Sequence, residues 1–235
     1  MNTLVCSNCG ISTQKSLDKY GRQLMKNQTG IYYCPKCFDK SFTENKISEK
    51  KVRKAAANLL KALGADLTDP NFIETPRRFA NVLMQRFGLL NNVEKELTGF
   101  SNAVFPCDST DMVTVRDIKA FSVCPHHILT VEYDIVVSYV PHGSAIGLSK
   151  IARMCKVLAN SPKLQEDVTQ EIADFMMKYV HTEDVMVVVS GRHLCMASRG
   201  VSQVNSTTIT SAVRGAFDTE PSARAEMLSL VGYVK

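Results

Sequence analysis

The chain has 235 residues, of which 45% are hydrophobic and 22% are charged, the composition of an ordinary globular protein. Its length suits one domain with a small appendage. No apolar run reaches the roughly 18 residues of a membrane-spanning helix, and the start MNTLVCSNCG lacks the basic and apolar regions of a secretory signal. These features predict a cytoplasmic protein with no membrane partner.

The net charge of +5 is spread unevenly along the chain. Residues 1–50 hold 8 of the 28 Lys and Arg residues and 4 of the 23 Asp and Glu residues. The remainder is therefore close to neutral and has no overall signature of nucleic-acid binding. We expect its function to reside in a localised site.

Four cysteines near the start form two CxxC pairs, separated by 24 residues, at Cys6, Cys9, Cys34 and Cys37. Without a secretion signal, this pattern favours metal ligands over disulfides. Four thiolates complete the tetrahedron of a zinc ion and leave no open position, so the predicted site is structural. The sequence GIYY before the second pair predicts a short strand. We therefore predict a zinc ribbon-like module over residues 1–42 and a second domain, beginning with helices, over residues 43–235.

Two helices are predicted at the start of the second domain. Apolar residues recur at helical spacing within residues 43–64, and the glycine at the end of this range is a typical C-terminal cap. A second helix is predicted to begin at Pro76, its first position, with Thr75 as the cap before it. Arg77 and Arg78 follow, where the helix dipole disfavours cations. A nearby anionic ligand or carboxylate partner would explain why two cations occupy this turn. Alternatively, the two side chains are simply solvated.

Strands are predicted over residues 112–121 and 129–140, which are β-branched and partly alternating, with SVCPHHI between them. Ser149 is then expected to cap a helix that runs to about residue 159. A longer helix follows, and its apolar face is predicted to comprise Leu164, Val168, Ile172, Phe175, Met176 and Tyr179.

The rest of the chain returns to strand character over residues 184–190 and 204–214, and a last helix is predicted to begin near Pro221. The order is two helices, two strands, two helices, two strands and a helix. This order predicts an α+β fold in which helices lie on one face of an antiparallel sheet.

Two segments combine cysteine with histidine: CPHH at residues 124–127 and HLC at residues 193–195. They hold three of the five histidines and two of the eight cysteines. Thiolate and imidazole are the ligands that zinc prefers, and three protein ligands with one open position are typical of a catalytic site. If Cys124, His127 and Cys195 bind the metal, His126 and His193 lie beside it. A histidine there is suited to moving protons near neutral pH.

Several separated segments resemble the signature segments of the GTP cyclohydrolase I family. They are ETPRRFANV, VRDIKAFSVCPHHILTVEYDIVVSYVPHGSAIGLSKIARM, LQEDVT, RHLCMASRGV and NSTTITSAVRGAF, and they lie in the family's order over roughly residues 48–232. The four-cysteine segment lies outside the core that this family shares. The resemblance implies that residues 43–235 form a catalytic domain of the tunnelling fold.

The resemblance also implies roles for individual residues. The zinc ligands of the family's CxHH and HxC motifs correspond to Cys124, His127 and Cys195, and the acid and base correspond to His126 and His193. The glutamate that holds the guanine edge corresponds to Glu166, with Gln165 beside it. The basic and hydroxyl residues that hold the triphosphate correspond to Arg78, Ser149, Lys150, Arg153 and Arg199.

The implied reaction is the opening of the GTP imidazole ring by a zinc-activated water, with release of formate and formation of 7,8-dihydroneopterin triphosphate, a step of pterin and tetrahydrofolate biosynthesis. The family works as a ring-shaped homo-oligomer, typically a decamer, with sites shared between subunits. Ser149 and Lys150 fit this assignment because a helix N-terminus favours phosphate.

Two positions depart from the family's pattern. Pro125 stands where a glutamate is usual, which removes a carboxylate near the metal and stiffens the loop. Asn81 stands where a lysine is expected, which removes a phosphate partner. Neither residue is a proposed ligand or proton carrier, so we expect retained chemistry with an altered rate, affinity or nucleotide preference.

Two alternatives remain open at this stage. The basic four-cysteine segment is also typical of a zinc-ribbon protein that binds nucleic acid or regulates a partner, although no basic or aromatic stripe supports this elsewhere. A second alternative is an enzyme of the same fold that acts on a related pterin or deazapurine, because fold alone does not fix function. The set of Cys124, His127 and Cys195 argues against a metal-free relative.

Overall fold

The computed structural model describes residues 25–26, 32–33, 47–88, 93–97 and 99–232. The chain forms two compact units, Met1–Ala80 and Asn81–Lys235. The predicted boundary at residue 42 and the cysteines Cys6, Cys9, Cys34 and Cys37 lie outside the described residues. Among the helices of the described part, none has the length and apolar character that crossing a membrane requires.

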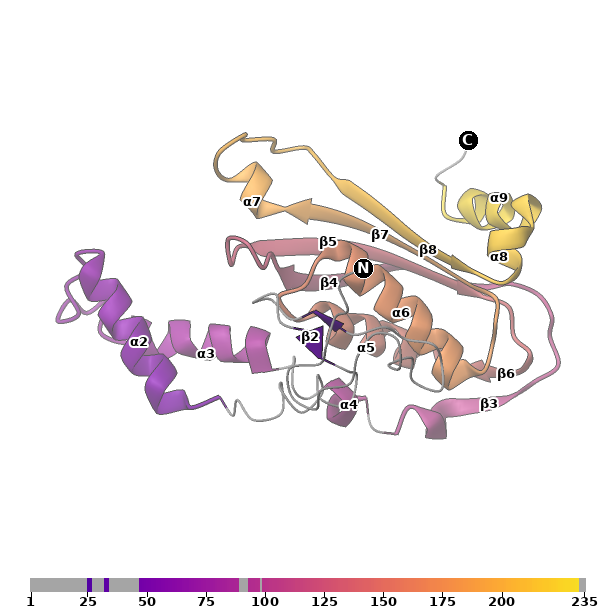
Figure 1. The fold of residues 1–235 in the computed structure, drawn as a ribbon, viewed down its shortest axis with the longest axis horizontal. Helices are drawn as coiled ribbons and strands as arrows, with labels where there is room; N and C mark the ends of the chain where they lie inside the picture. Colours follow the sequence, from indigo (N-terminus) through magenta and orange to yellow (C-terminus); the bar gives the residue numbers. More distant parts are fainter. Residues whose placement is uncertain (1–24, 27–31, 34–46, 89–92, 98, 233–235) are drawn as a thin grey trace. The chain divides into compact units, whose positions relative to one another are not determined.

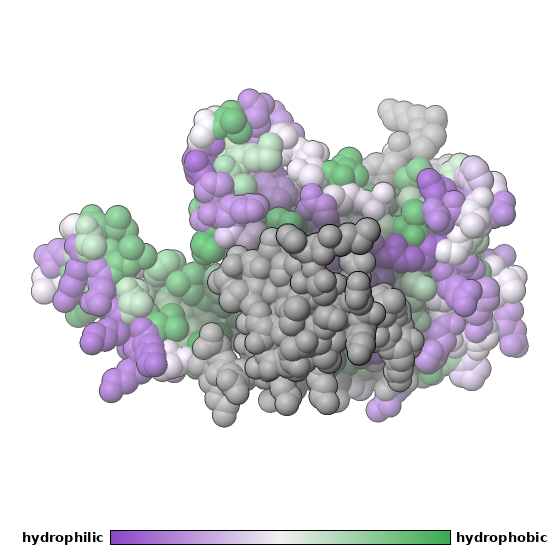
Figure 2. All heavy atoms as spheres, viewed as in Figure 1, coloured by the Kyte–Doolittle hydropathy of each residue, from purple (hydrophilic) through white to green (hydrophobic). Residues whose placement is uncertain are grey.

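The first unit contains two short strands, the first predicted helix and the start of the second. β1 (Met25–Lys26) pairs antiparallel with β2 (Tyr32–Tyr33), so the predicted strand in GIYY is confirmed. α2 (Glu49–Ala62) begins after Ser48 and ends before Gly64, whose φ of 84° favours glycine. Figure 2 shows hydrophilic residues toward the start of α2 and hydrophobic residues toward its end.

α3 (Thr75–Gly88) begins one residue before the predicted helix, because Thr75 is not its cap. The carbonyl of Glu74 accepts the first helical hydrogen bond, from the N–H of Arg78, while the Thr75 hydroxyl donates to Asn71 at 3.3 Å. The carboxylate of Glu74 pairs with Arg77 at 2.6 Å. A carboxylate partner for one of the two arginines is thus confirmed.

A four-stranded antiparallel sheet forms the centre of the second unit, in the order β4-β5-β7-β8. Its strands are β4 (Val113–Val123), β5 (Thr130–Tyr139), β7 (Val185–His193) and β8 (Thr208–Arg214). All four were predicted. β7 extends beyond the predicted residue 190 because Val131 of β5 still pairs with His193. The ladder therefore carries this histidine on a rigid strand.

Helices cover one face of the sheet and part of the other, on which Phe121 and Ile209 remain 51% and 59% exposed. α5 (Leu148–Ala159) and α6 (Gln165–Val180) pack against one face (Figure 1), where alternate residues such as Ile135 and Val187 are fully buried. The opposite set, including Val136 and Met186, packs against α8 (Ala216–Thr219) and α9 (Pro221–Leu230). The prediction that helices lie on one face only is therefore wrong. A continuous apolar strand does not reveal how its two faces are covered.

Two predicted features of α5 and α6 are also wrong. Gly147, not Ser149, precedes α5; its N–H donates to the Ala103 carbonyl at 2.9 Å and its carbonyl accepts from Lys150 at 2.8 Å. Ser149 therefore lies inside the first turn. Leu164 precedes α6 and is 44% exposed, so it is not part of the apolar face, whose other predicted members are wholly or partly buried.

The two ends of the sheet have different surroundings. One end carries the CPHH turn after β4 and the HLC segment after β7. The other carries a small sheet of β3 (Val104–Cys107) and β6 (Gly143–Ile146), from which α5 starts. The remaining elements are the short helices α4 (Val93–Glu96), η2 (Ser101–Ala103) and α7 (Leu194–Ala197). They were not predicted, because so few residues show no periodicity.

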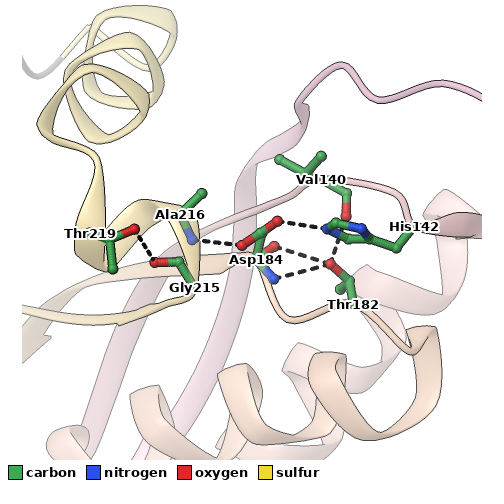
Figure 3. A network of polar contacts seen from close by, with 7 residues as sticks. All are labelled: Val140, His142, Thr182, Asp184, Gly215, Ala216 and Thr219. Atoms are coloured by element: carbon green, nitrogen blue, oxygen red, sulfur yellow. Dashed lines mark hydrogen bonds and ion pairs between the residues drawn. The ribbon is translucent and has the colours of Figure 1, made fainter.

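A polar network ties the strands together at the end that carries β6 (Figure 3). The carboxylate of Asp184 accepts the N–H of Ala216 and contacts Nε2 of His142, each at 2.6 Å. The Thr182 hydroxyl donates to the Val140 carbonyl at 2.6 Å. The network joins the start of β7 to the start of α8 and to the loop after β5.

Candidate active site

The CPHH turn is closed by hydrogen bonds of Cys124, the buried residue at the end of β4. Its N–H donates to the Leu129 carbonyl at 2.8 Å, and its carbonyl accepts from the N–H of Ile128 at 2.9 Å. Ile128 has a φ of 57°, an unfavourable conformation for a β-branched residue that is common at functional turns. The turn leaves His126 and His127 exposed beside the buried sulfur.

Three potential metal ligands meet at this turn. The donor atoms of Cys124, His127 and Cys195 all lie within 4.8 Å of one another, and no second group of this kind occurs among the residues that the structure describes. Cys124 Sγ lies 4.0 Å from Nδ1 of His127. Sulfur and nitrogen ligands on a tetrahedral zinc ion are about 3.6 Å apart, so a small contraction suffices. Two thiols and one imidazole therefore fit zinc.

Distance to Cys124 alone does not separate the two histidines of the turn. His126 Nδ1 lies 3.8 Å from Cys124 Sγ, slightly nearer than the ring of His127. Only His127, however, also comes together with Cys195. The geometry thus favours His127 as the ligand and leaves His126 beside the site.

Cys195 reaches the turn from α7, which follows β7 directly. Burial raises the pKa of its thiol, and the hydrogen bond with Cys124 raises it further, while nearby Arg199 opposes the shift. Without a metal, this thiol is therefore protonated at neutral pH. Because zinc binds the thiolate, metal binding must release a proton.

His193 is the last residue of β7 and precedes Cys195 by two residues. Its Nε2 lies 2.8 Å from Oε1 of Gln165, the first residue of α6. Burial lowers the pKa of His193, and the carboxylate of Glu166 opposes this shift. The imidazole is therefore largely neutral at pH 7 and able to accept a proton.

The two residues of the QE pair face different surroundings. Gln165 is 3% exposed and its amide nitrogen donates to the carbonyls of Val189 and Thr208. Glu166 is exposed at the start of α6, close enough to His193 to act on its pKa. The carboxylate of Glu166 therefore faces solvent, whereas the carboxamide of Gln165 is hydrogen-bonded within the protein.

The predicted phosphate-binding residues of α5 lie elsewhere. Nζ of Lys150 is 5.7 Å from the ring centroid of Phe100, which packs edge-on against Phe175 at 5.3 Å. Phe175 lies in the second half of α6, whereas Glu166 begins that helix. Within one chain, the start of α5, with Ser149, Lys150 and Arg153, is thus at the opposite end of the helical layer from the pocket.

Two further arginines were predicted to bind phosphate. Arg199 follows α7, is exposed, and lowers the pKa of Cys195, which places its charge near the pocket. Arg78 is exposed in the first turn of α3, in the unit Met1–Ala80. The structure therefore groups Arg199 with the pocket residues, whereas Arg78 belongs to the other unit.

Two residues next to Gln165 and His193 were not singled out from the sequence. Tyr133 is buried, and burial raises the pKa of its hydroxyl to about 12. Gly191 pairs with it across the strands, and a Cβ there would lie 2.2 Å from Oε1 of Gln165. A glycine inside a strand, next to the HLC segment, was the available signal of close packing.

Comparisons with known proteins cover most of the chain. Residues 52–232 match the family model of GTP cyclohydrolase I. A GTP cyclohydrolase 1 from Halalkalibacterium halodurans is 37% identical over 188 residues, which are 80% of this chain and 98% of that protein. One from Methylococcus capsulatus is 40% identical over 178 residues, 75% of this chain and 94% of that protein. The two CxxC pairs precede the matched residues.

Proposed function

The chain belongs to the GTP cyclohydrolase I family, and from this premise we propose that the site formed by the CPHH turn, α7 and the start of α6 is where it opens the imidazole ring of GTP. The activity is that of a GTP cyclohydrolase I, which releases formate and forms 7,8-dihydroneopterin triphosphate. The observation that carries this assignment is the convergence of Cys124, His127 and Cys195, the last of which follows His193 by two residues.

The three converging residues would hold a catalytic zinc ion. Zinc supplies Lewis acidity in such a site and lowers the pKa of water, while three protein ligands leave the fourth position open. Cys124 contributes from the end of a paired strand and Cys195 from α7, so the two sulfurs are held by rigid elements.

His126 and His193 are proposed as the proton carriers. His193 is largely neutral at pH 7 because burial lowers its pKa, so it can take up a proton and return it. His126 is exposed next to Cys124 and is free of the three-ligand group. Two histidines close in sequence to the ligands suit a reaction that both protonates a ring nitrogen and removes a proton from water.

Glu166 is proposed to hold the guanine edge. Its carboxylate is exposed at the start of α6, where it can accept hydrogen bonds from the ring N–H and amino groups of guanine. Arg199, which is exposed near Cys195, is proposed to neutralise part of the triphosphate.

The remaining phosphate ligands are proposed to come from a second copy of the chain. Ser149, Lys150 and Arg153 lie at the other end of the helical layer, so GTP bound at the pocket would meet those of a neighbour. β4 and β8 each pair with one strand of the described sheet, which leaves an edge on either side for joining other subunits. We propose a tunnelling-fold ring, a decamer as in the family.

Complementation between variants tests the shared site. Lys150→Ala and Cys195→Ser should each be inactive, and subunits exchanged between them should recover part of the activity, because some sites then combine two intact halves. Sedimentation should show a large oligomer. A fully active monomer would contradict the shared site.

GTP turnover tests the function itself. The protein with zinc should release formate from GTP and generate a pterin chromophore, and Cys195→Ser should abolish both signals while residues far from the pocket stay folded. Absence of formate with zinc bound would refute the assignment. Binding of nucleic acid without any turnover would support the alternative based on the four-cysteine segment.

The four N-terminal cysteines are proposed to hold a second, structural zinc ion. Cys6, Cys9, Cys34 and Cys37 supply four thiolates with the spacing of a zinc ribbon, and β1 and β2 lie between the two pairs. Four thiolates leave no open coordination position for a substrate, so this ion would stabilise the module and take no part in the reaction.

A further inference from the structure

The carboxamide of Gln165 has its orientation fixed by its neighbours. Its Nε2 donates to the carbonyls of Val189 at 3.0 Å and Thr208 at 2.9 Å. Backbone carbonyls only accept hydrogen bonds, so a flipped amide would bring its oxygen against two other acceptors. The nitrogen must therefore face the strands, and the oxygen Oε1 must point the other way.

The oxygen of Gln165 in turn dictates which nitrogen of His193 carries a proton. Oε1 lies 2.8 Å from Nε2 of His193. An amide oxygen accepts and cannot donate, so Nε2 must be the N–H donor of this bond. A neutral imidazole has one such proton, which leaves the lone pair on Nδ1.

We propose that Gln165 is a positioning residue that holds His193 as the Nε2–H tautomer and thereby makes Nδ1 the nitrogen that exchanges protons in the pocket. The inference rests on the proposed function of His193 as a proton carrier. The sequence predicted that Gln165 contacts the substrate directly. In the proposed role, Gln165 acts on the substrate indirectly, by orienting His193.

A chain of hydroxyl groups supports the same orientation. Thr169 donates from its hydroxyl to the Gln165 carbonyl at 2.7 Å, so its single proton is committed. The Thr210 hydroxyl, 2.6 Å from that of Thr169, must then donate to it. Thr210 Oγ1 is left as an acceptor, 3.1 Å from Nε2 of Gln165. Each hydroxyl and amide proton of this network therefore has an acceptor other than Oε1 of Gln165. The proton on Nε2 of His193 is the one left to donate to Oε1.

Gly191 provides the space for this arrangement. A Cβ at this position would lie 2.2 Å from Oε1 of Gln165 and 2.9 Å from Cε1 of Tyr133. The Tyr133 ring stands edge-on to the His193 ring, with centroids 6.4 Å apart, and limits how the imidazole can tilt. Gly191→Ala should therefore displace the amide oxygen without changing any group that forms the hydrogen bond.

The tautomer can be measured directly. Solid-state ¹³C and ¹⁵N NMR of the zinc-loaded full chain with labelled histidine distinguishes the two tautomers, and the His193 signals are those lost in His193→Asn. We expect Nε2–H in the wild type and a mixture containing Nδ1–H in Gln165→Met and Gly191→Ala. Gln170→Met is the matched control, since Gln170 is exposed on the same helix and contacts Arg214.

Kinetics provide the second readout. Gln165→Met should lower kcat by about 10- to 100-fold, as is typical when the group that orients a functional histidine is removed. The KM for GTP and the zinc content should change less than twofold, because the amide touches neither substrate nor ligands. Gln170→Met should retain wild-type kcat.

The outcomes separate this inference from the proposed function. A proton on Nδ1 of His193 in the wild type would overturn the inference, even if Gln165→Met fails to fold. Retention of the Nε2–H tautomer and of kcat in Gln165→Met would overturn it as well. A wild-type protein that shows the Nε2–H tautomer but does not convert GTP would refute the proposed function and leave the tautomer assignment standing.

Discussion

His126 and His127 are neighbours in the chain with different predicted roles. Their Nδ1 atoms lie 3.8 and 4.0 Å from Cys124 Sγ, but only His127 also meets Cys195. His127→Ala should therefore lose both zinc and turnover, because two ligands hold zinc poorly. His126→Ala should keep its zinc and lose about 100- to 10,000-fold in turnover, the usual range for a proton carrier. Metal analysis together with formate release measures both effects.

A matched control for this pair is His181→Asn. His181 is the exposed, left-handed residue that ends α6, with φ 59°, a conformation that asparagine tolerates. The His181→Asn variant should have unchanged zinc content and turnover. Loss of metal from His126→Ala alone would exchange the two roles, and full zinc and activity in both variants would exclude the turn from the active site.

The junction of β8 and α8 depends on a glycine. Gly215 has φ 58°, and a Cβ there would lie 2.1 Å from Oδ1 of Asp184 and 2.5 Å from the Glu183 carbonyl. Gly215→Ala should destabilise the protein by about 2 kcal/mol or more, from backbone strain and the clash together. Gly143→Ala is the control, because Gly143 shares the positive φ but has open space around it. Thermal unfolding of both variants should show the larger loss of stability for Gly215→Ala. Equal losses of stability would show that the clash with Asp184 and Glu183 does not contribute.

The same junction should respond to acid. Burial acts to raise the pKa of Asp184, but hydrogen bonds from the Ala216 N–H and from His142 outweigh it, and the net shift is downward. A lowered pKa means that ionised Asp184 stabilises the fold above the ordinary carboxyl pKa of about 3.9 and that this contribution disappears as the pH falls through the lowered value. Asp184→Asn should therefore lower Tm at pH 7, with a difference from the wild type that narrows below about pH 4. A difference independent of pH would contradict the role of the charge.

At the scale of the whole molecule, the sequence predicts two chemically different zinc ions. Metal analysis of the intact protein should give about two zinc ions per chain, one in a closed four-cysteine site and one in an open three-ligand site. Cys6→Ser should lose one ion and retain GTP turnover, whereas Cys195→Ser should lose the other ion and all turnover. A wild-type value of about one would remove one of the two sites.

The sequence by itself determined the main elements of the second unit and the candidate ligands. Alternation in β5 and the apolar repeat in α6 are local signals, so they survive without knowledge of the fold. The CPHH and HLC segments are likewise local, and zinc chemistry alone relates Cys124 to Cys195. Short elements such as α7, and helix starts such as that of α5, were missed because a few residues carry no period.

Only the tertiary structure decided what depends on strand pairing. The apolar run of β7 is compatible with cover on one face or both, and the packing of α9 against Met186 settles this. The side chain of Gln165 is bound within the protein because the antiparallel register of β7 and β8 brings the carbonyls of Val189 and Thr208 beneath α6. The same register sets the start of α5 and the metal pocket at opposite ends of the sheet. Periodicity acts over a few residues, whereas register joins segments far apart in the chain, so the sequence pattern could not reveal these contacts.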